Sequence, residues 1–274
     1  MPAPEQGIAQ TQQEIQADLE LILNAAHEAG KIALAWFGKD PEVWMKEGDS
    51  PVSEADHAAD KYLRETLLTA RPDYGWLSEE TTDDGERLKH QRVFVVDPID
   101  GTRGFIDGNP KWCVSVAIVE NGRPYCGVLD CPALDEVYHA GIGGGAFLNG
   151  KRIAAGDVEK PVRVSGPAAL VNQLARDTNS VIDGREFIPS LAYRIACVAT
   201  GTLDGTFARA DCHDWDIAAV DLIAAEAGAK LTTMDNCAIS YNRQKITHGI
   251  LVAGHKAIHG QMLQAASNQS KQNK

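Results

Sequence analysis

Residues 93–102 constrain the fold of this chain more than any other stretch. They begin with Val-Phe-Val-Val, and this run of β-branched and aromatic residues is typical of a buried strand. The strand is followed at once by Asp-Pro-Ile-Asp-Gly at residues 97–101, where proline fixes one backbone angle and glycine permits a sharp turn. Because Asp97 and Asp100 lie so close together at the end of one strand, we predict that both contribute to one cation site.

The residues directly after these acids are suited to an anion. Gly101 and Thr102 can present backbone N–H groups at a turn or at the start of a helix, where such groups bind anions. Carboxylate oxygens are the ligands that Mg²⁺ prefers in proteins. Acidic cation ligands followed by an anion-binding turn therefore indicate phosphate chemistry with Mg²⁺ as the cation.

The composition sets limits on size, partners and location. The chain has 274 residues, 44% of them hydrophobic, which is enough for one large domain or two closely packed ones. Its formal net charge of −12 disfavours nucleic acid and anionic lipid as partners, because both select basic surfaces. No apolar run approaches the roughly 20 residues that a membrane span needs, and the N-terminus does not resemble a secretory leader. We therefore expect a cytoplasmic protein that does not interact with membranes and has reduced, mostly buried cysteines.

The periodicity of apolar residues predicts alternating helices and strands. Residues 1–12 and 267–274 are polar and are expected to be irregular, flexible ends. Between them we expect an α+β half at 13–155, with the metal-binding strand and an antiparallel sheet, and an α/β half at 156–266 that completes the active site. The further predicted elements are helices at 13–36, 190–198 and 214–228, a helix that opens at 50–56, and strands at 113–120, 125–130, 136–140, 231–234 and 249–253.

Other acidic residues have both a structural and a functional interpretation. Asp56 and Asp216 each lie in the first turn of a predicted helix, where an acid caps the helix or favours its dipole. A helix start can also direct a carboxylate into a cleft. Glu79 and Glu80 precede the metal-binding strand, where adjacent glutamates usually form a solvated loop. Their position also makes one of them a candidate third metal ligand.

Four motifs in this order resemble the Mg²⁺-dependent, lithium-sensitive inositol monophosphatase family. The motifs are Ser-Pro-Val-Ser-Glu-Ala-Asp at 50–56, Ser-Glu-Glu at 78–80, Asp-Pro-Ile-Asp-Gly-Thr at 97–102 and Trp-Asp-Ile-Ala-Ala at 215–219. The similarity extends from about residue 15 to residue 260. It implies a layered αβαβα sandwich of the α/β (α+β) class, as in fructose-1,6-bisphosphatase, and usually a homodimer.

The resemblance also implies roles for individual residues. Two or three Mg²⁺ ions would be bound by Glu79, Asp97, the Ile99 carbonyl, Asp100 and Asp216. Gly101 and Thr102 would hold the phosphate, and Asp56 would pair with the Thr102 hydroxyl. Paired ions roughly 3.5–4 Å apart can acidify the attacking water and stabilise the leaving oxygen. Glu79, or Thr102 backed by Asp56, would accept the proton of that water, and Asp100 and Asp216 would also contact the substrate.

The substrate end of the predicted site departs from the inositol-specific pattern. Inositol-specific members carry a glutamate several residues before the Trp-Asp motif, whereas this chain reads Phe-Ala-Arg-Ala at 207–210. Arg209 would suit a second phosphate or another anion of the substrate, and Arg103 points the same way. A surface ion pair of Arg209 with Asp211 or Asp214 is the alternative interpretation.

These observations predict one activity and leave two alternatives open. We expect a phosphomonoesterase that hydrolyses inositol monophosphate or a similar small polyol phosphate. The first alternative is the same chemistry on adenosine 3',5'-bisphosphate, as in the related 3'(2'),5'-bisphosphate nucleotidases. The second is a regulatory binding protein, because the bacterial extragenic-suppressor branch of the family, which is associated with transcription complexes, also resembles this chain.

Overall fold

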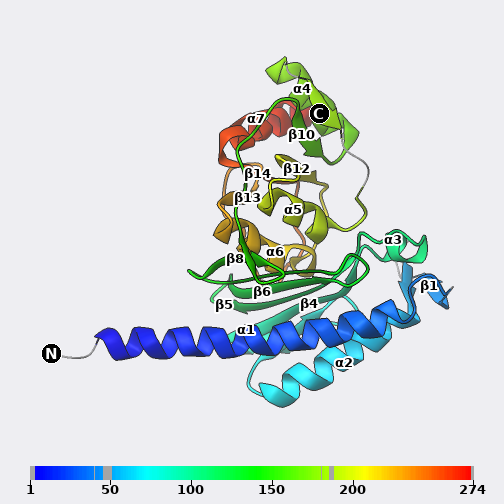
Figure 1. The fold of residues 1–274 in the computed structure, drawn as a ribbon, viewed down its shortest axis with the longest axis vertical. Helices are drawn as coiled ribbons and strands as arrows, with labels where there is room; N and C mark the ends of the chain where they lie inside the picture. The colour runs from blue at the N-terminus through cyan, green and yellow to red at the C-terminus, as the bar shows by residue number, and fades with distance from the viewer. Residues whose placement is uncertain (1–3, 40, 46–50, 180, 185–187, 273–274) are drawn as a thin grey trace.

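The structure is a computed structural model that describes all of the chain except residues 1–3, 40, 46–50, 180, 185–187 and 273–274. Ser50, the first residue of one family-like motif, therefore lies outside the described residues. The elements stack as helices, sheet, helices, sheet and helices (Figure 1). This arrangement confirms the predicted αβαβα sandwich. Within the described chain, every helix is too short or too polar to span a lipid bilayer.

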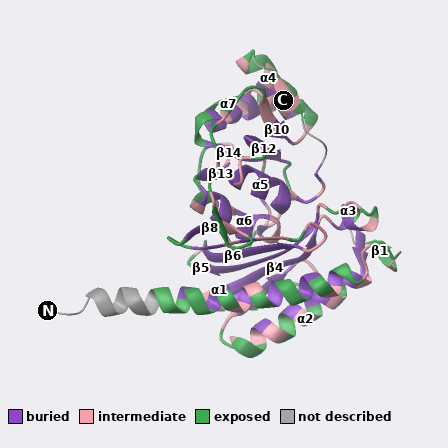
Figure 2. Cartoon of the chain, viewed as in Figure 1, coloured by how far each residue is buried: buried purple, intermediate pink, exposed green. Residues whose placement is uncertain are grey.

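The first outer layer consists of α1 (Pro4–Leu34) and α2 (Glu54–Ala70), which lie across one face of the larger sheet (Figure 1). Their apolar residues recur at helical spacing and are buried against the sheet, as Ile22 and Leu63 illustrate. Figure 2 shows the two sheets and the helices between them as mostly buried, whereas these outer helices alternate between buried and exposed residues.

The larger sheet has seven strands in the order β3-β4-β5-β6-β7-β8-β9. Only β3 and β4 are parallel, and every other pair in this sheet is antiparallel. The carboxyl ends of β3 and β4 therefore lie at the same edge. The strands are β3 (Gly75–Ser78), β4 (Arg92–Asp100), β5 (Cys113–Glu120), β6 (Arg123–Cys131), β7 (Glu136–Gly141), β8 (Gly145–Leu148) and β9 (Lys151–Ile153).

The second half of the chain builds the remaining layers. Helices α5 (Leu191–Ala199) and α6 (Asp214–Glu226) lie between the two sheets, and α4 (Ala168–Thr178) and α7 (Lys256–Gln272) cover the far side (Figure 1). The smaller sheet has the order β11-β10-β12-β14-β13. Its strands are β10 (Val162–Ser165), β11 (Ile182–Gly184), β12 (Gly205–Ala208), β13 (Ala229–Thr233) and β14 (Leu251–His255). The smaller elements of the fold are β1 (Val43–Met45), β2 (Pro51–Ser53), the 3₁₀ helix η1 (Glu86–Lys89) and α3 (Thr102–Ile106).

Both ends of the chain differ from the sequence prediction. Helix α1 begins at Pro4, so most of residues 1–12 are helical rather than irregular. Helix α7 continues to Gln272, where an irregular tail was predicted. Asn268 in this region donates a hydrogen bond to Asp177 of α4 at 2.9 Å. Polar composition misled the prediction because Gln, Glu, Ala and Lys extend a helix readily once its neighbouring turns are packed.

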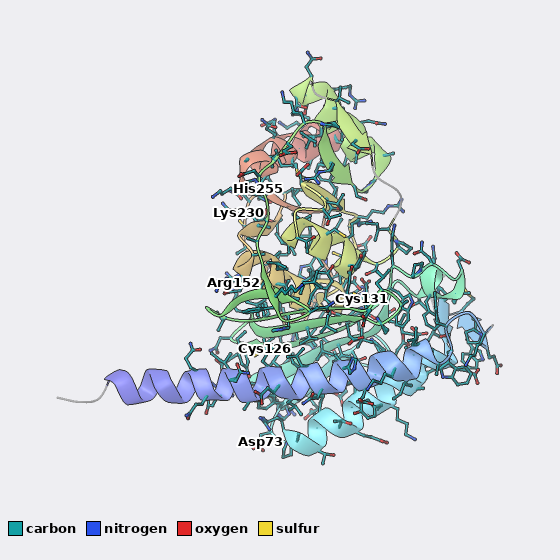
Figure 3. All side chains as sticks on the ribbon, in the orientation of Figure 1. Asp73, Cys126, Cys131, Arg152, Lys230 and His255 are labelled. Atoms are coloured by element: carbon teal, nitrogen blue, oxygen red, sulfur yellow. The ribbon has the colours of Figure 1, made fainter. Side chains whose placement is uncertain are left out.

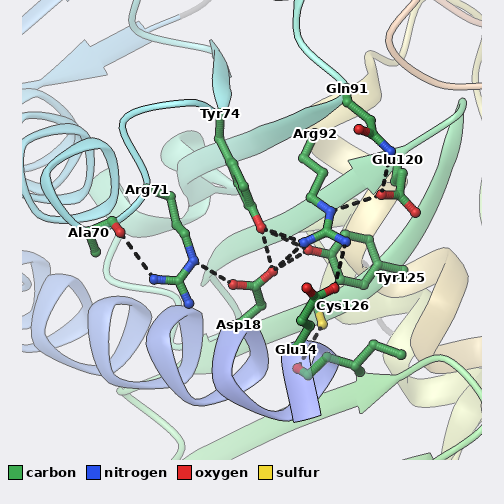
Figure 4. A network of polar contacts seen from close by, with 11 residues as sticks. Glu14, Asp18, Ala70, Arg71, Tyr74, Gln91, Arg92, Glu120, Tyr125 and Cys126 are labelled. Carbon is green, nitrogen blue, oxygen red and sulfur yellow. Dashed lines mark hydrogen bonds and ion pairs between the residues drawn. The ribbon is translucent and has the colours of Figure 1, made fainter. Parts of the chain in front are cut away.

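A buried carboxylate joins α1 to the larger sheet (Figure 4). Asp18 is 1% exposed and accepts hydrogen bonds from Arg71 Nε at 2.8 Å and the Tyr74 hydroxyl at 2.7 Å. The Tyr125 hydroxyl donates to the same carboxylate, and the Arg92 guanidinium lies 5.2 Å from the Tyr125 ring centroid. Because these partners come from several elements, the network fixes how α1 lies on the sheet.

The cysteines are all free thiols, and only Cys237 is exposed. Cys126 and Cys131 both lie on β6, in the larger sheet (Figure 3). Burial raises the pKa of Cys126 to about 12, so this thiol stays protonated and unreactive at neutral pH. The thiols are therefore free and mostly buried, as the sequence predicted.

Helix α6 packs on β6 at a glycine. A Cβ atom added at Gly127 would lie 2.6 Å from the carbonyl oxygen of Ala219 in α6, which is closer than two such atoms can approach. Glycine therefore allows the backbones of the strand and the helix to meet. Because Asp216 lies in the first turn of α6, this contact also helps to set the position of that carboxylate.

We predict that Gly127→Ala lowers the free energy of unfolding by about 1–3 kcal/mol, because the added methyl group pushes α6 off the sheet. Urea denaturation of the two proteins measures the difference. Gly249→Ala is the matched control, since a Cβ there meets no atom within 4 Å. Equal effects of the two substitutions would contradict this account of the packing.

Candidate active site

The centre of the candidate site is the irregular end of β4. The strand does not end at Val96, as the sequence suggested, but continues to Asp100 with a register shift between Asp97 and Asp100. Asp97 is 1% exposed, and its Oδ1 accepts a hydrogen bond from the Ile99 N–H at 3.0 Å. The shift turns the chain so that both carboxylates line the same cavity.

Two other elements bring carboxylates to Asp97. Glu79 follows β3, and its N–H donates to the Val96 carbonyl at 3.2 Å. Asp216 lies in the first turn of α6, where its Oδ2 accepts a hydrogen bond from the His213 N–H at 2.7 Å. One oxygen from each of Glu79, Asp97 and Asp216 lies within 4.8 Å of the others. Three acids far apart in sequence thus form one cluster.

Asp100 lies beside this cluster, and one of its carboxylate oxygens is hydrogen-bonded to residues outside the cluster. Its Oδ2 accepts hydrogen bonds from the Ser190 hydroxyl and, at 2.7 Å, from the Ala192 N–H at the start of α5. Because one oxygen is engaged in this way, Asp100 can offer a cation only Oδ1. Asp100 therefore links the acidic cluster to α5.

The predicted phosphate turn lies directly after Asp100. Gly101 has a φ of 97°, a conformation that favours glycine, and a Cβ at this position would lie 3.1 Å from Ser190. The Thr102 hydroxyl is 3.2 Å from Asp56 Oδ1 and 3.0 Å from the Ile99 carbonyl, so it shares its hydrogen bond between them. The structure thus shows the predicted pairing of Asp56 with Thr102. The Ile99 carbonyl, a predicted ligand, faces the Thr102 hydroxyl.

Asp56 is held in place by the start of its own helix. Its Oδ2 accepts hydrogen bonds from the Ser53 N–H at 2.8 Å and from the Ser53 hydroxyl at 2.6 Å. The structure shows the predicted helix cap together with the contact to Thr102, and a role for Asp56 in catalysis stays a prediction. One carboxylate oxygen caps α2, and the other orients Thr102.

The electrostatics of the cluster favour a cation. Burial, followed by the neighbouring Glu79, Asp100 and Asp216, raises the pKa of Asp97 well above its usual range. Burial, followed by Asp100, raises the pKa of Asp216, and burial raises the pKa of Asp100 to about 6. These shifts all arise because negative charges are gathered where water cannot screen them. A divalent cation would relieve this repulsion, and a donor set of carboxylate oxygens suits Mg²⁺.

The site opens into a cavity of about 580 Å³. Its lining includes Glu79, Asp97, Asp100, Gly101, Thr102 and Asp216. These are six of the nine predicted site residues. A seventh, Asp56, contacts the site through its hydrogen bond with Thr102. Arg103 and Pro189 also line this cavity.

Arg209, predicted to bind substrate, does not line this cavity. It lines a neighbouring one, of about 470 Å³, that shares Pro189 with the first. The alternative interpretation, an ion pair with Asp211 or Asp214, is not found either, although all three residues are described. Asp214 is buried instead with His248, whose Nε2 lies 2.7 Å from its Oδ1. Arg209 precedes the Trp-Asp motif in sequence, but the structure places it in the neighbouring cavity rather than in the candidate site.

Several residues of the site were missed in the sequence. His213 is the N-cap residue of α6, and its ring stacks on Trp215 with centroids 4.5 Å apart. Asp60 accepts hydrogen bonds from Ser78 and, at 3.1 Å, from Thr81, on either side of the two glutamates. The position of His213 was predictable from the sequence, because it directly precedes the helix whose first turn carries Asp216. The contacts of Asp60 span distant segments and leave no local signal.

A buried arginine supports the loop after Glu79. Arg87 is 2% exposed and pairs with Asp83 at 2.9 Å. It also donates hydrogen bonds to the Asn242 side chain at 2.6 Å and to the Arg243 carbonyl at 2.8 Å. The loop that carries Glu79 is therefore anchored to a segment from the other half of the chain.

Comparisons with known proteins agree with this geometry. The inositol monophosphatase family matches residues 14–271. An inositol-1-monophosphatase from Mesorhizobium japonicum is 32% identical over 269 residues, which cover 90% of this chain and 95% of that protein. A histidinol-phosphatase from Chlorobaculum parvum is 33% identical over 266 residues, which cover 92% of this chain and 97% of that protein.

A solved structure shares the fold. The crystal structure of the extragenic suppressor protein SuhB from Bartonella henselae matches with a TM-score of 0.78 and 28% identity, covering 91% of this chain and 98% of that one. The family match spans both sheets and every candidate site residue of the structure. By its sequence, its five-layered fold and its named relatives, the chain belongs to the inositol monophosphatase family and is a phosphomonoesterase.

Proposed function

We propose that this protein is a Mg²⁺-dependent phosphatase of a small polyol phosphate, with inositol monophosphate as the first candidate substrate. One observation carries the proposal. The carboxylates of Glu79, Asp97 and Asp216 converge within 4.8 Å, and the Gly101–Thr102 turn lines the same cavity. Hard oxygen ligands beside an anion-binding turn are what hydrolysis of a phosphate dianion requires.

The acidic cluster would hold the cations. Glu79, Asp97 and Asp216 offer a shared site. Asp100 Oδ1, and the lone pair of the Ile99 carbonyl that Thr102 does not use, would extend the donor set toward a second or third ion. When bound, Mg²⁺ would neutralise the phosphate dianion, lower the pKa of the attacking water and stabilise the leaving oxygen. The carboxylates of the chain fix where that charge is located.

The phosphate turn would orient the ester. The N–H groups of Gly101 and Thr102, at the start of α3, are the donors proposed for the phosphate oxygens. Thr102, oriented by Asp56, or Glu79 would accept the proton of the attacking water. Burial raises the pKa of Asp56, which makes its carboxylate a better proton acceptor through the Thr102 hydroxyl.

The relatives leave the substrate open. One is an inositol-1-monophosphatase and another is a histidinol-phosphatase. Hydrolysis of a 3'(2'),5'-bisphosphate nucleotide is the second candidate activity, supported by Arg103 in the site cavity and Arg209 in the adjoining one. A regulatory role is the third, since the similar structure is an extragenic suppressor protein. We also propose that the protein is a cytoplasmic homodimer. Its acidic composition supports the further proposal that it does not bind nucleic acid directly.

A substrate panel tests these candidates. Phosphate release from inositol 1-phosphate, histidinol phosphate and adenosine 3',5'-bisphosphate would be measured with purified protein, with Mg²⁺ and with EDTA. Mg²⁺-dependent turnover of at least one ester supports the phosphatase, and the highest kcat/KM identifies the class. Full biological function retained by Asp97→Asn and Asp216→Asn variants without phosphatase activity would favour the regulatory role.

We predict opposite effects of Asp97→Asn on activity and on stability. Losing a central cation ligand should cost about 4 kcal/mol of transition-state stabilisation, or ~10³-fold in kcat/KM. The metal-free protein should become more stable, because the substitution removes one of the mutually repelling charges. Thermal unfolding in EDTA should show a higher Tm, by roughly 2–4 °C for each kcal/mol of repulsion relieved.

Asp204→Asn is the control for this pair of effects. Asp204 is also buried, but it pairs with Arg163 at 2.7 Å, so its loss should lower the Tm. A lower Tm for Asp97→Asn as well would show that repulsion does not dominate the acidic cluster.

We also predict inhibition by lithium. Li⁺ should displace the most weakly held Mg²⁺, because the acidic cluster binds small hard cations through charge and oxygen ligands rather than through a rigid cage. Activity would be followed during a LiCl titration at limiting Mg²⁺, with NaCl at equal ionic strength as the control. Identical curves for the two salts would disprove the prediction.

A further inference from the structure

Residues 241–248 connect β13 to β14 and belong to neither a helix nor a strand of the two sheets. This segment contacts both of the elements that bring a carboxylate to Asp97 from elsewhere in the chain. On one side it is bonded to the loop that follows Glu79. On the other side it is bonded to the start of α6, the helix that carries Asp216.

Arg87 joins the segment to the loop that follows Glu79. Its guanidinium binds both carboxylate oxygens of Asp83, through Nε at 3.0 Å and through a terminal nitrogen at 2.9 Å. Other N–H groups of the same guanidinium donate to the Asn242 side chain at 2.6 Å and to the Arg243 carbonyl at 2.8 Å. Because Asp83 closely follows Glu79 in the chain, this ion pair ties the Glu79 loop to the segment.

Asp214 joins the same segment to the start of α6. It is the first residue of the helix and is 1% exposed. Its Oδ2 accepts a hydrogen bond from the Asn242 N–H at 2.7 Å, and its Oδ1 lies 2.7 Å from His248 Nε2. Since an ionised carboxylate can only accept, Nε2 is the donor of that bond. The Asp214 N–H donates in turn to the Ile246 carbonyl at 3.0 Å, so the first turn of α6 is held against the segment.

Asn242 is the residue at which the two connections meet. Its side-chain oxygen accepts from Arg87, and its backbone N–H donates to Asp214. Its φ of 53° is a left-handed conformation that asparagine adopts more readily than most residues. A continuous chain of hydrogen bonds therefore runs from the Glu79 loop through Asn242 to the helix that carries Asp216.

The two carboxylates at the ends of this chain of bonds repel each other. Oxygens of Glu79, Asp97 and Asp216 lie within 4.8 Å of one another. Without a cation between them, like charges at this distance favour a movement that separates the elements carrying them. A cation would then have to bring the carboxylates back together at a cost in affinity. Contacts that resist this movement preorganise the cation site.

We propose that Asn242, together with Arg87 and His248, is a positioning residue of the cation site. The three hold Glu79 and Asp216 at the spacing that one divalent cation requires. They act through the backbone of the Glu79 loop and of α6, and none of them is among the residues that line the site cavity. The proposal rests on the proposed function, because it takes the acidic cluster to be a Mg²⁺ site.

A purely structural network would behave differently from a positioning network. Ordinary buried hydrogen bonds stabilise the fold whether or not a cation is present, and their loss leaves the affinity for the cation unchanged. Outer partners that orient metal ligands change metal affinity by about 10–100-fold when they are lost. The dissociation constant for Mg²⁺, measured without substrate, therefore distinguishes the two roles.

Asn242→Gly tests the proposal with little disturbance of the backbone. Glycine adopts the left-handed conformation readily and keeps the N–H that binds Asp214, but it removes the oxygen that binds Arg87. Isothermal titration calorimetry of the full chain with Mg²⁺ alone should show a dissociation constant about 10-fold higher than in wild type. In phosphatase assays, the Mg²⁺ concentration for half-maximal activity should rise by a larger factor than kcat at saturating Mg²⁺ falls.

Two variants of His248 test the other half of the connection. His248→Leu removes the donor to Asp214 and should weaken Mg²⁺ binding. His248→Gln can still donate through its side-chain amide, so it should restore much of the affinity. Equal Mg²⁺ dissociation constants for His248→Leu and wild type would overturn the role of His248.

Arg87→Lys and Arg163→Lys are a matched pair that controls for general loss of stability. Each of these arginines binds an aspartate with two side-chain hydrogen bonds, Asp83 for Arg87 and Asp204 for Arg163. Only Arg87→Lys should raise the Mg²⁺ dissociation constant. An equal rise in Arg163→Lys would show that any loss of stability weakens the cation site, and it would overturn the proposal. If Arg87→Lys does not fold, Asn242→Gly takes its place in this comparison.

The two proposals fail differently. If the wild-type protein hydrolyses an ester with Mg²⁺ while Asn242→Gly binds Mg²⁺ with the wild-type dissociation constant, the positioning role is wrong and the proposed function stands. If the wild-type protein neither binds Mg²⁺ nor hydrolyses any ester with it, the proposed function is wrong and the positioning role falls with it.

Discussion

The repulsion between carboxylates at the end of β4 is the interaction on which the rest of the site depends. Asp97, Asp100 and Asp216 are held together although burial and mutual charge raise the pKa of each. Backbone N–H groups hold these carboxylates in place, because each carboxylate accepts at least one hydrogen bond from such a group. These bonds orient the side chains without neutralising them. The fold thus gathers negative charge that a bound divalent cation would neutralise.

The layered architecture is what brings these groups to one point. The parallel pair β3 and β4 places Glu79 beside Asp97, and α6 adds Asp216 from the other half of the chain. Two contacts fix the positions of these elements relative to one another. Helix α6 approaches β6 closely at Gly127, and Arg87 anchors the Glu79 loop. The site consequently lies where both halves of the chain meet, and each half supplies carboxylates that the other lacks.

Two neighbouring cavities share Pro189 in their linings. The first is lined by Glu79, Asp97, Asp100 and Asp216 and by the Gly101–Thr102 turn. The second is lined by Arg194 and Arg209 and by one carboxylate, Asp211. Relatives of this chain share the family while their names refer to an inositol phosphatase and a histidinol phosphatase, so membership of the family does not fix the substrate.

The sequence by itself determined the reaction class, because each motif that carries it is local. Neighbouring residues in the sequence are enough to recognise these motifs, which are the acids at 97 and 100 with the turn that follows, and the helix starts at Asp56 and Asp216. Only the tertiary structure decided that Asp60 and Arg87 support the Glu79 loop, that Arg209 lines a separate cavity, and that Arg194 is buried without a full set of acceptors. Such features depend on contacts between distant segments and on burial, which no local pattern encodes. The chain ends follow the same rule, since packing against α4 rather than composition extends α7.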